Sequence, residues 1–137
     1  MATQTAQPAS QVIKDSYVSI NVLREDQTPT AEQSAQAIRR LNQMMAVWEA
    51  NGRHLGYIPI GTVTDVLTVP DAAIMGIWGS LAILLAPLFG ASVSPELLEM
   101  TQRGLDVIDK ITVKEVIAQL DVPEPSDLVG TFSISAG

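Results

Sequence analysis

The sequence at residues 37–52 is AIRRLNQMMAVWEANG, and we expect the rest of the chain to be organised around it. Its large apolar residues recur at intervals of three, four and three: Ile38, Leu41, Met45 and Trp48. This spacing places them on one stripe of a helix. A helix that carries a tryptophan on its apolar stripe needs neighbouring elements to cover it, so the flanking segments are expected to be its partners.

The ends of this helix are marked by capping signals. Thr30 is followed three residues later by Gln33, which is the spacing of a capping box. At the other end, Asn51-Gly52 offers a left-handed stop. The sequence therefore predicts a helix that begins after Thr30 and ends at Asn51.

An amphipathic helix is predicted before it, over residues 10–23. Ser10 could cap this helix, and Ile13, Tyr17 and Ile20 would lie on one of its faces. Its β-branched residues leave a strand as the alternative. Residues 1–9 are small and polar, and they are expected to form a flexible N-terminus.

Residues 53–70 change character, because Gly and Pro interrupt short β-branched pairs. This pattern predicts an extended loop or a hairpin insertion.

The most apolar element is predicted over residues 72–89, with Asp71 as its cap and Gly90 as its end. No charged residue occurs between Asp71 and Glu96. A helix that is apolar all round is either the centre of a bundle or a membrane span. The glycines within the segment and the absence of flanking basic residues favour the bundle. Gly76 and Gly79 are expected to allow close packing against the Trp48 helix.

A last helix is predicted to begin at Ser94-Pro95-Glu96, which combines a cap, a proline in the first turn and an acid facing the helix dipole. Its apolar stripe comprises Leu97 or Leu98, Thr101, Leu105, Ile108 and Thr112. This helix ends either near Lys110 or at Leu120, because the prolines that follow cannot continue it.

Residues 121–137 are predicted to be an extended C-terminal arm. Phe132 and Ile134 alternate with Ser and Thr, a pattern typical of a strand that has no partner in its own chain. The predicted fold is thus all-α: a bundle of about four helices in one domain (10–120) with the insertion at 53–70 and the arm. The expected bundle core is Ile38, Leu41, Met45, Trp48, Leu81, Leu85, Leu105 and Ile108.

The charge distribution excludes one class of function. The net charge is −7. Residues 1–56 hold five basic and five acidic side chains, whereas residues 57–137 hold three basic and ten acidic ones. Binding to nucleic acid by phosphate neutralisation needs clustered Lys and Arg, which this chain lacks.

The residues that could carry chemistry are few. His54 is the only histidine and is expected to be a surface or interface residue, with no ligands near it in sequence. Asp106 and Asp109 are expected to lie on a solvated helix face. The glycines lack the spacing of a phosphate-binding loop, and there is no cysteine to bind a metal. The sequence therefore predicts neither an enzyme nor a cofactor.

The order of these motifs resembles the head-to-tail adaptor family of short-tailed bacteriophages, also described as tail accessory, packaged-DNA stabilisation or head completion proteins. The resemblance covers roughly residues 10–112. It consists of Leu-x-x-Met-Met-x-x-Trp-x-x-x-Gly at 41–52, Gly-Tyr at 56–57, Val-Pro-Asp at 69–71, Leu-Ala-x-x-Leu-Ala-Pro at 81–87 and Pro-Glu at 95–96.

The resemblance implies a structural role in the virion. Members of the family assemble in the host cytoplasm as a ring, usually of twelve copies, between the portal protein and a tail or nozzle protein. Double-stranded DNA would pass through such a ring without specific binding, and no membrane would be involved. Family members hold the portal with a long basic arm, whereas the arm here is short and acidic. Its expected contact residues with the portal or a neighbour are Leu128, Val129, Phe132 and Ile134. The alternative is a small membrane-active protein that uses residues 72–95.

Overall fold

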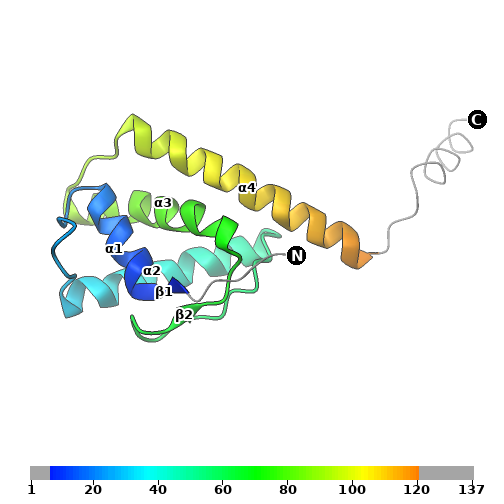
Figure 1. Cartoon of the computed structure of the whole chain (residues 1–137), viewed down its shortest axis with the longest axis horizontal. Helices are drawn as coiled ribbons and strands as arrows, with labels where there is room; N and C mark the ends of the chain where they lie inside the picture. The colour runs from blue at the N-terminus through cyan, green and yellow to red at the C-terminus, as the bar shows by residue number, and fades with distance from the viewer. Residues whose placement is uncertain (1–6, 121–137) are drawn as a thin grey trace, which may run out of the picture.

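Helix α3 (Ile74–Leu85) is the central element of the fold. The computed structural model describes residues 7–120, and their side chains as far as residue 113. Within this range α3 contacts α1 (Ala9–Ser19), α2 (Ala31–Ala50) and α4 (Pro95–Leu120). Figure 1 shows α3 between α2 and α4, with α1 crossing it. The prediction of a small all-α bundle is confirmed.

The start and end of α2 are fixed by the capping groups predicted for them. The backbone N–H of Gln33 donates to the Thr30 hydroxyl at 3.1 Å, and the Gln33 side chain accepts from the Thr30 N–H at 2.9 Å. At the other end Gly52 adopts a φ of +93°, and the Arg53 N–H donates to the Trp48 carbonyl at 2.8 Å. Both ends of α2 were therefore predictable from the local sequence.

Six of the eight predicted core residues are buried, and the other two, Ile38 and Leu105, are partly buried against the core. The buried six are Leu41, Met45, Trp48, Leu81, Leu85 and Ile108. In α2 the buried face also includes Ala37 and Met44, which the predicted stripe left out. The face is wider than a single stripe because α2 covers more than one neighbour.

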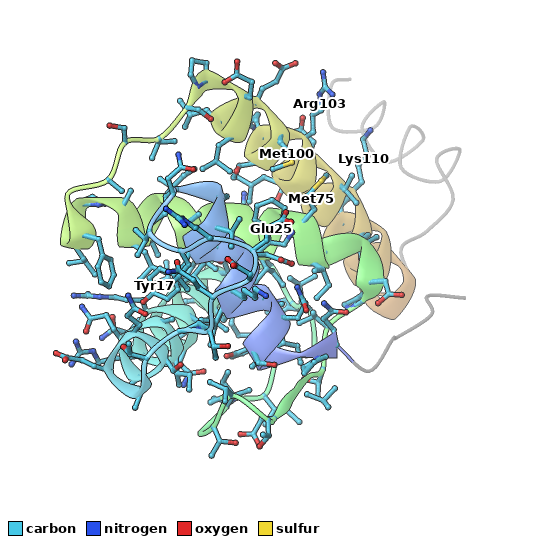
Figure 2. All side chains as sticks on the ribbon, turned by 60° about the vertical axis from the view of Figure 1, so that its left-hand side comes forward. Tyr17, Glu25, Met75, Met100, Arg103 and Lys110 are labelled. Carbon is cyan, nitrogen blue, oxygen red and sulfur yellow. The ribbon has the colours of Figure 1, made fainter. Side chains whose placement is uncertain are left out.

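Helix α1 buries the face that was predicted, although its ends differ from the prediction. Ile13 and Tyr17 are fully buried and the Tyr17 hydroxyl donates to the Gln33 carbonyl of α2 at 2.7 Å. The Tyr17 side chain lies between α1 and α2 in Figure 2. Burial raises its pKa to about 12. The helix ends at Ser19, before the predicted Leu23, because Asn21 takes a left-handed conformation with φ of +62°.

The predicted cap at Ser10 is wrong, because the residue at the N-cap of α1 is Pro8 and no side chain caps the helix. The first N–H groups instead donate to residues 53–70, here called the connector: Ala9 to the Asp65 carbonyl at 2.8 Å and Ser10 to the Val63 carbonyl at 2.9 Å. Backbone carbonyls that are distant in sequence thus accept from the N–H groups of the first helical turn, a role that a capping side chain commonly fills. The expectation of a flexible N-terminus is wrong for residues 7–9, and residues 1–6 lie outside the described residues.

Residues 53–70 are extended, as predicted, but they do not form a hairpin. Strand β2 (Val66–Leu67) pairs antiparallel with β1 (Gln7–Pro8). The connector therefore uses the residues before α1 as its strand partner.

Asn42 of α2 fastens the connector to the bundle. Its Nδ2 donates to the Ile60 carbonyl at 2.9 Å, and its Oδ1 accepts from the Ile60 N–H at 3.1 Å and from the Tyr57 hydroxyl. Burial raises the pKa of Tyr57 to about 12, so this phenol remains a donor across the physiological range.

Replacing Asn42 with Ala is expected to lower the free energy of unfolding by about 2 kcal/mol, because both backbone groups of Ile60 lose their partner in a part-buried site. Tyr57→Phe is expected to cost about 1 kcal/mol, since it removes a single hydrogen bond. Urea denaturation followed by circular dichroism measures both values. An equal effect of the two variants would contradict the central role given to Asn42.

The apolar segment forms three consecutive helical pieces: η1 (Asp71–Ala73), α3 and η2 (Ala86–Phe89). Pro70 occupies the N-cap of η1 and no side chain caps it, so the prediction that Asp71 is the cap is wrong. Asp71 is the first residue of this turn, where an acid faces the positive end of the helix dipole. The end at Gly90 is confirmed, with φ of +63°.

The glycines of α3 face α4, and the predicted contact with the Trp48 helix is wrong. A Cβ added to Gly76 would lie 2.9 Å from the Gly104 carbonyl carbon, and one added to Gly79 would overlap the Thr101 hydroxyl. In the other direction, a Cβ on Gly104 would lie 2.6 Å from the Gly76 nitrogen and Cα. Gly104, for which the sequence predicted no role, allows the two backbones to touch.

Helix α4 begins as predicted, with the Ser94 hydroxyl accepting from the Leu97 N–H at 3.1 Å. It continues as one helix to Leu120, the longer of the two predicted ends. Leu97 is buried and Leu98 is 51% exposed, which decides the alternative left open in the sequence. Arg103 and Lys110 point away from the bundle (Figure 2).

Candidate docking groove

A groove of about 520 Å³ lies between α2, α3 and α4. Its wall is mostly apolar, and it includes two side chains that are strongly exposed: Val47 of α2 at 57% and Leu84 of α3 at 46%. The remaining lining residues are Arg40, Gln43, Met44, Trp48, Ser80, Ile83, Thr101 and Leu105. We call this feature the α2–α3–α4 groove. An apolar concavity with a few polar groups is the usual form of a binding site.

Trp48 is held rigidly at the groove by a chain of contacts. The Arg53 guanidinium lies 5.1 Å from the centre of the Trp48 ring, a cation–π distance. Arg53 Nε in turn donates to the Asp109 carboxylate of α4 at 2.8 Å. These three residues join the end of α2, the connector and α4, so the wall of the groove is preformed.

Two polar atoms in the groove wall have no hydrogen-bond partner: Thr101 Oγ1 and Arg40 Nε. Thr101 is only 3% exposed. A buried threonine in a helix commonly bonds the carbonyl one turn earlier, as Thr112 does to the Ile108 carbonyl at 3.0 Å. Buried polar groups without partners are uncommon in folded proteins and invite an explanation, such as a ligand that supplies the partner.

The predicted chemistry-bearing residues are dispersed in the structure. His54 is exposed, with its Nδ1 2.8 Å from the Glu49 carboxylate. Asp106 is exposed as predicted, whereas Asp109 is half-exposed and pairs with Arg53. Within residues 7–113, no group of three or more His, Asp or Glu side chains could hold a metal ion. The predicted arm contacts Leu128, Val129, Phe132 and Ile134 lie outside the described residues.

The segment Asp71–Phe89 is long and apolar enough, by length and composition, to cross a membrane. The core helix of a bundle passes the same test. Here three other helices pack against α3, and both Leu81 and Leu85 are fully buried. The exposed apolar residues of the segment are Met75, Leu84, Leu88 and Phe89.

The groove was not predicted from the sequence, although the sequence contains a signal for it. Within residues 7–120, three helices surround α3, and a helix that is apolar all round then keeps some apolar side chains outside the core. Leu84 is such a residue, and Val47 adjoins the predicted stripe of α2. Which of these side chains converge on one groove depends on the crossing of the helices.

Comparison with known proteins does not assign this chain to a family. No protein-family model matches the sequence, and no curated protein sequence matches it significantly.

Proposed function

We propose that this chain is a structural adaptor subunit of a phage head-to-tail connector, which forms a ring, binds the portal, helps to retain packaged DNA and seats the tail. Its action is binding, not catalysis. It would assemble with its portal in the host cytoplasm and remain in the virion at the head-to-tail interface.

The observation that carries the proposal is the order of the elements. A capped helix that carries Trp48 in its last turn is followed by the extended residues 53–70, which Asn42 fastens to α2. An apolar central helix and a helix that begins with Pro95-Glu96 come next. This is the order of the motifs on which the resemblance rests. The helix α4 extends beyond the other helices (Figure 1), and residues 121–137 follow its end.

The charge of the chain fits a ring through which DNA slides. The ten acidic and three basic side chains of residues 57–137 give that part an excess of negative charge. Like charge repels phosphate and supplies no counterion-release affinity, so DNA could move past without adhering. A ring also multiplies weak contacts, because each subunit repeats the same interface.

Replacing both Phe132 and Ile134 with Ser in the full chain is expected to weaken docking on the portal protein of the same phage at least about a hundredfold. Two large apolar side chains, which contact either the portal or a neighbouring copy in the ring that docks on it, would lose burial worth about 1.5–3 kcal/mol each. Co-sedimentation of the chain with assembled portal measures this. The matched control is Ser133→Ala with Ser135→Ala, which changes the opposite face of the same segment. Docking that is unchanged by the first pair would overturn the role of the arm, and the absence of any docking by the unaltered chain would overturn the adaptor proposal.

A second candidate function, a membrane-active protein, is favoured only by the apolar length of Asp71–Phe89. Flotation of the purified chain with phospholipid vesicles separates the two proposals. The adaptor is expected to purify in plain buffer and to stay at the bottom of the gradient, whereas a membrane-active protein would need detergent and would float.

A further inference from the structure

We infer that the α2–α3–α4 groove receives residues 126–134 of a neighbouring copy of this chain. The inference rests on the proposed function in one respect, namely that copies of the chain assemble with one another. It adds the receptor surface, which the resemblance does not specify. Charge, chemical character, size and reach support it.

The charges of the groove and the segment are complementary. Residues 121–137 contain Asp121, Glu124 and Asp127 and no Lys or Arg. The groove wall contains one ionisable side chain, Arg40, and its Nε lacks an acceptor. A carboxylate docked beside the Arg40 guanidinium would form a charge-assisted hydrogen bond with it, which is stronger than a neutral one.

The chemical character of the two surfaces also matches. The end of the segment SDLVGTFSI, residues 131–134, alternates small polar with large apolar residues and places Phe132 and Ile134 on one side when extended. The groove offers exposed Val47 and Leu84 to such side chains.

The volume of the groove sets the size of the occupant. About 520 Å³ lies within the range of sites that hold a drug-sized molecule. Two or three large side chains from an extended segment fit this volume.

The geometry of α4 favours a segment from another copy. Leu120, at the end of α4, follows Thr101 of the groove by nineteen residues. The helix axis between them is about 28 Å long, at roughly 1.5 Å per residue. Eight further residues reach Leu128, and they span at most about 26–29 Å when fully extended. Folding back onto its own groove would therefore need a reversal at Leu120, and Leu128 could then reach the level of Thr101 only by full extension. Pro123 and Pro125 favour a stiff, extended course, so the segment is better placed to reach a neighbour.

A mixing experiment with full-length chains tests the inference. The groove variant carries Val47→Glu and Leu84→Glu, both at exposed positions, and the segment variant carries Phe132→Ser and Ile134→Ser. Leu98→Glu, at an exposed residue outside the groove, is the control. Thermal unfolding followed by circular dichroism confirms that each variant is folded, and sedimentation velocity over a range of concentrations measures association.

The unaltered chain and the Leu98→Glu control are expected to self-associate. Each of the other two variants alone is expected to associate at least about a hundredfold more weakly. An equal mixture of the two should form heterodimers, since an intact segment from one can then occupy the intact groove of the other. A monomeric unaltered chain, a variant that associates normally, or a mixture that stays monomeric would each overturn the inference. If the unaltered chain still docks on portal in any of these cases, the adaptor proposal stands without it.

Discussion

Replacing Gly104 with Ala is expected to lower the free energy of unfolding by about 3 kcal/mol, the upper part of the usual range for overpacking a core. The new Cβ would lie 2.6 Å from the nitrogen and Cα of Gly76, which are backbone atoms of the neighbouring helix. Backbone atoms cannot rotate aside as a side chain does, so α3 and α4 would have to separate. Ala ordinarily stabilises a helix relative to Gly by about 0.5–1 kcal/mol, which is too little to reverse the sign.

Urea denaturation followed by far-ultraviolet circular dichroism measures this loss. The matched control is Gly61→Ala, because the nearest atom to its new Cβ would be the Asp65 carboxylate oxygen at 3.9 Å and the glycine has no positive φ. That variant is expected to stay within about 0.5 kcal/mol of the unaltered chain. A Gly104→Ala protein as stable as the Gly61→Ala protein would show that the two helices do not touch there.

The second large effect is expected from Leu81→Ala, which should cost about 2–5 kcal/mol. Leu81 is fully buried at the centre of α3, and its loss would leave a cavity among helices that cannot easily close it. Leu84→Ala is the matched control, because Leu84 is in the same helix and is 46% exposed. It should change the stability by less than about 1 kcal/mol.

This pair of variants tests the central physical claim about the chain. In the bundle, the two leucines differ because one is enclosed by protein and the other is open to water. Thermal unfolding in plain buffer measures the difference, which should appear as a lower melting temperature of the Leu81 variant alone. Equal effects would mean that α3 is not packed as the structure has it.

The sequence by itself determined the helices whose signals are local. The capping box at Thr30, the stop at Gly52, and the Ser94-Pro95 start all depend on groups within five residues of one another, and all three are present. Much of the core followed from periodicity, since Leu41, Met45, Leu81 and Ile108 are buried as predicted. Local hydrogen bonding and a period of 3.6 residues do not need the rest of the chain.

Only the tertiary structure decided which elements meet. The α1 N-terminus is capped by the Asp65 and Val63 carbonyls, the strand partner of β2 is β1, and the glycines of α3 meet Gly104. The groove likewise arises from residues on three helices, and the Arg53–Asp109 pair that supports it joins positions 56 residues apart. Such contacts depend on how helices cross and how chain ends are placed in space. A one-dimensional pattern shows which face of a helix is apolar, but not which neighbour covers it or where the covering stops.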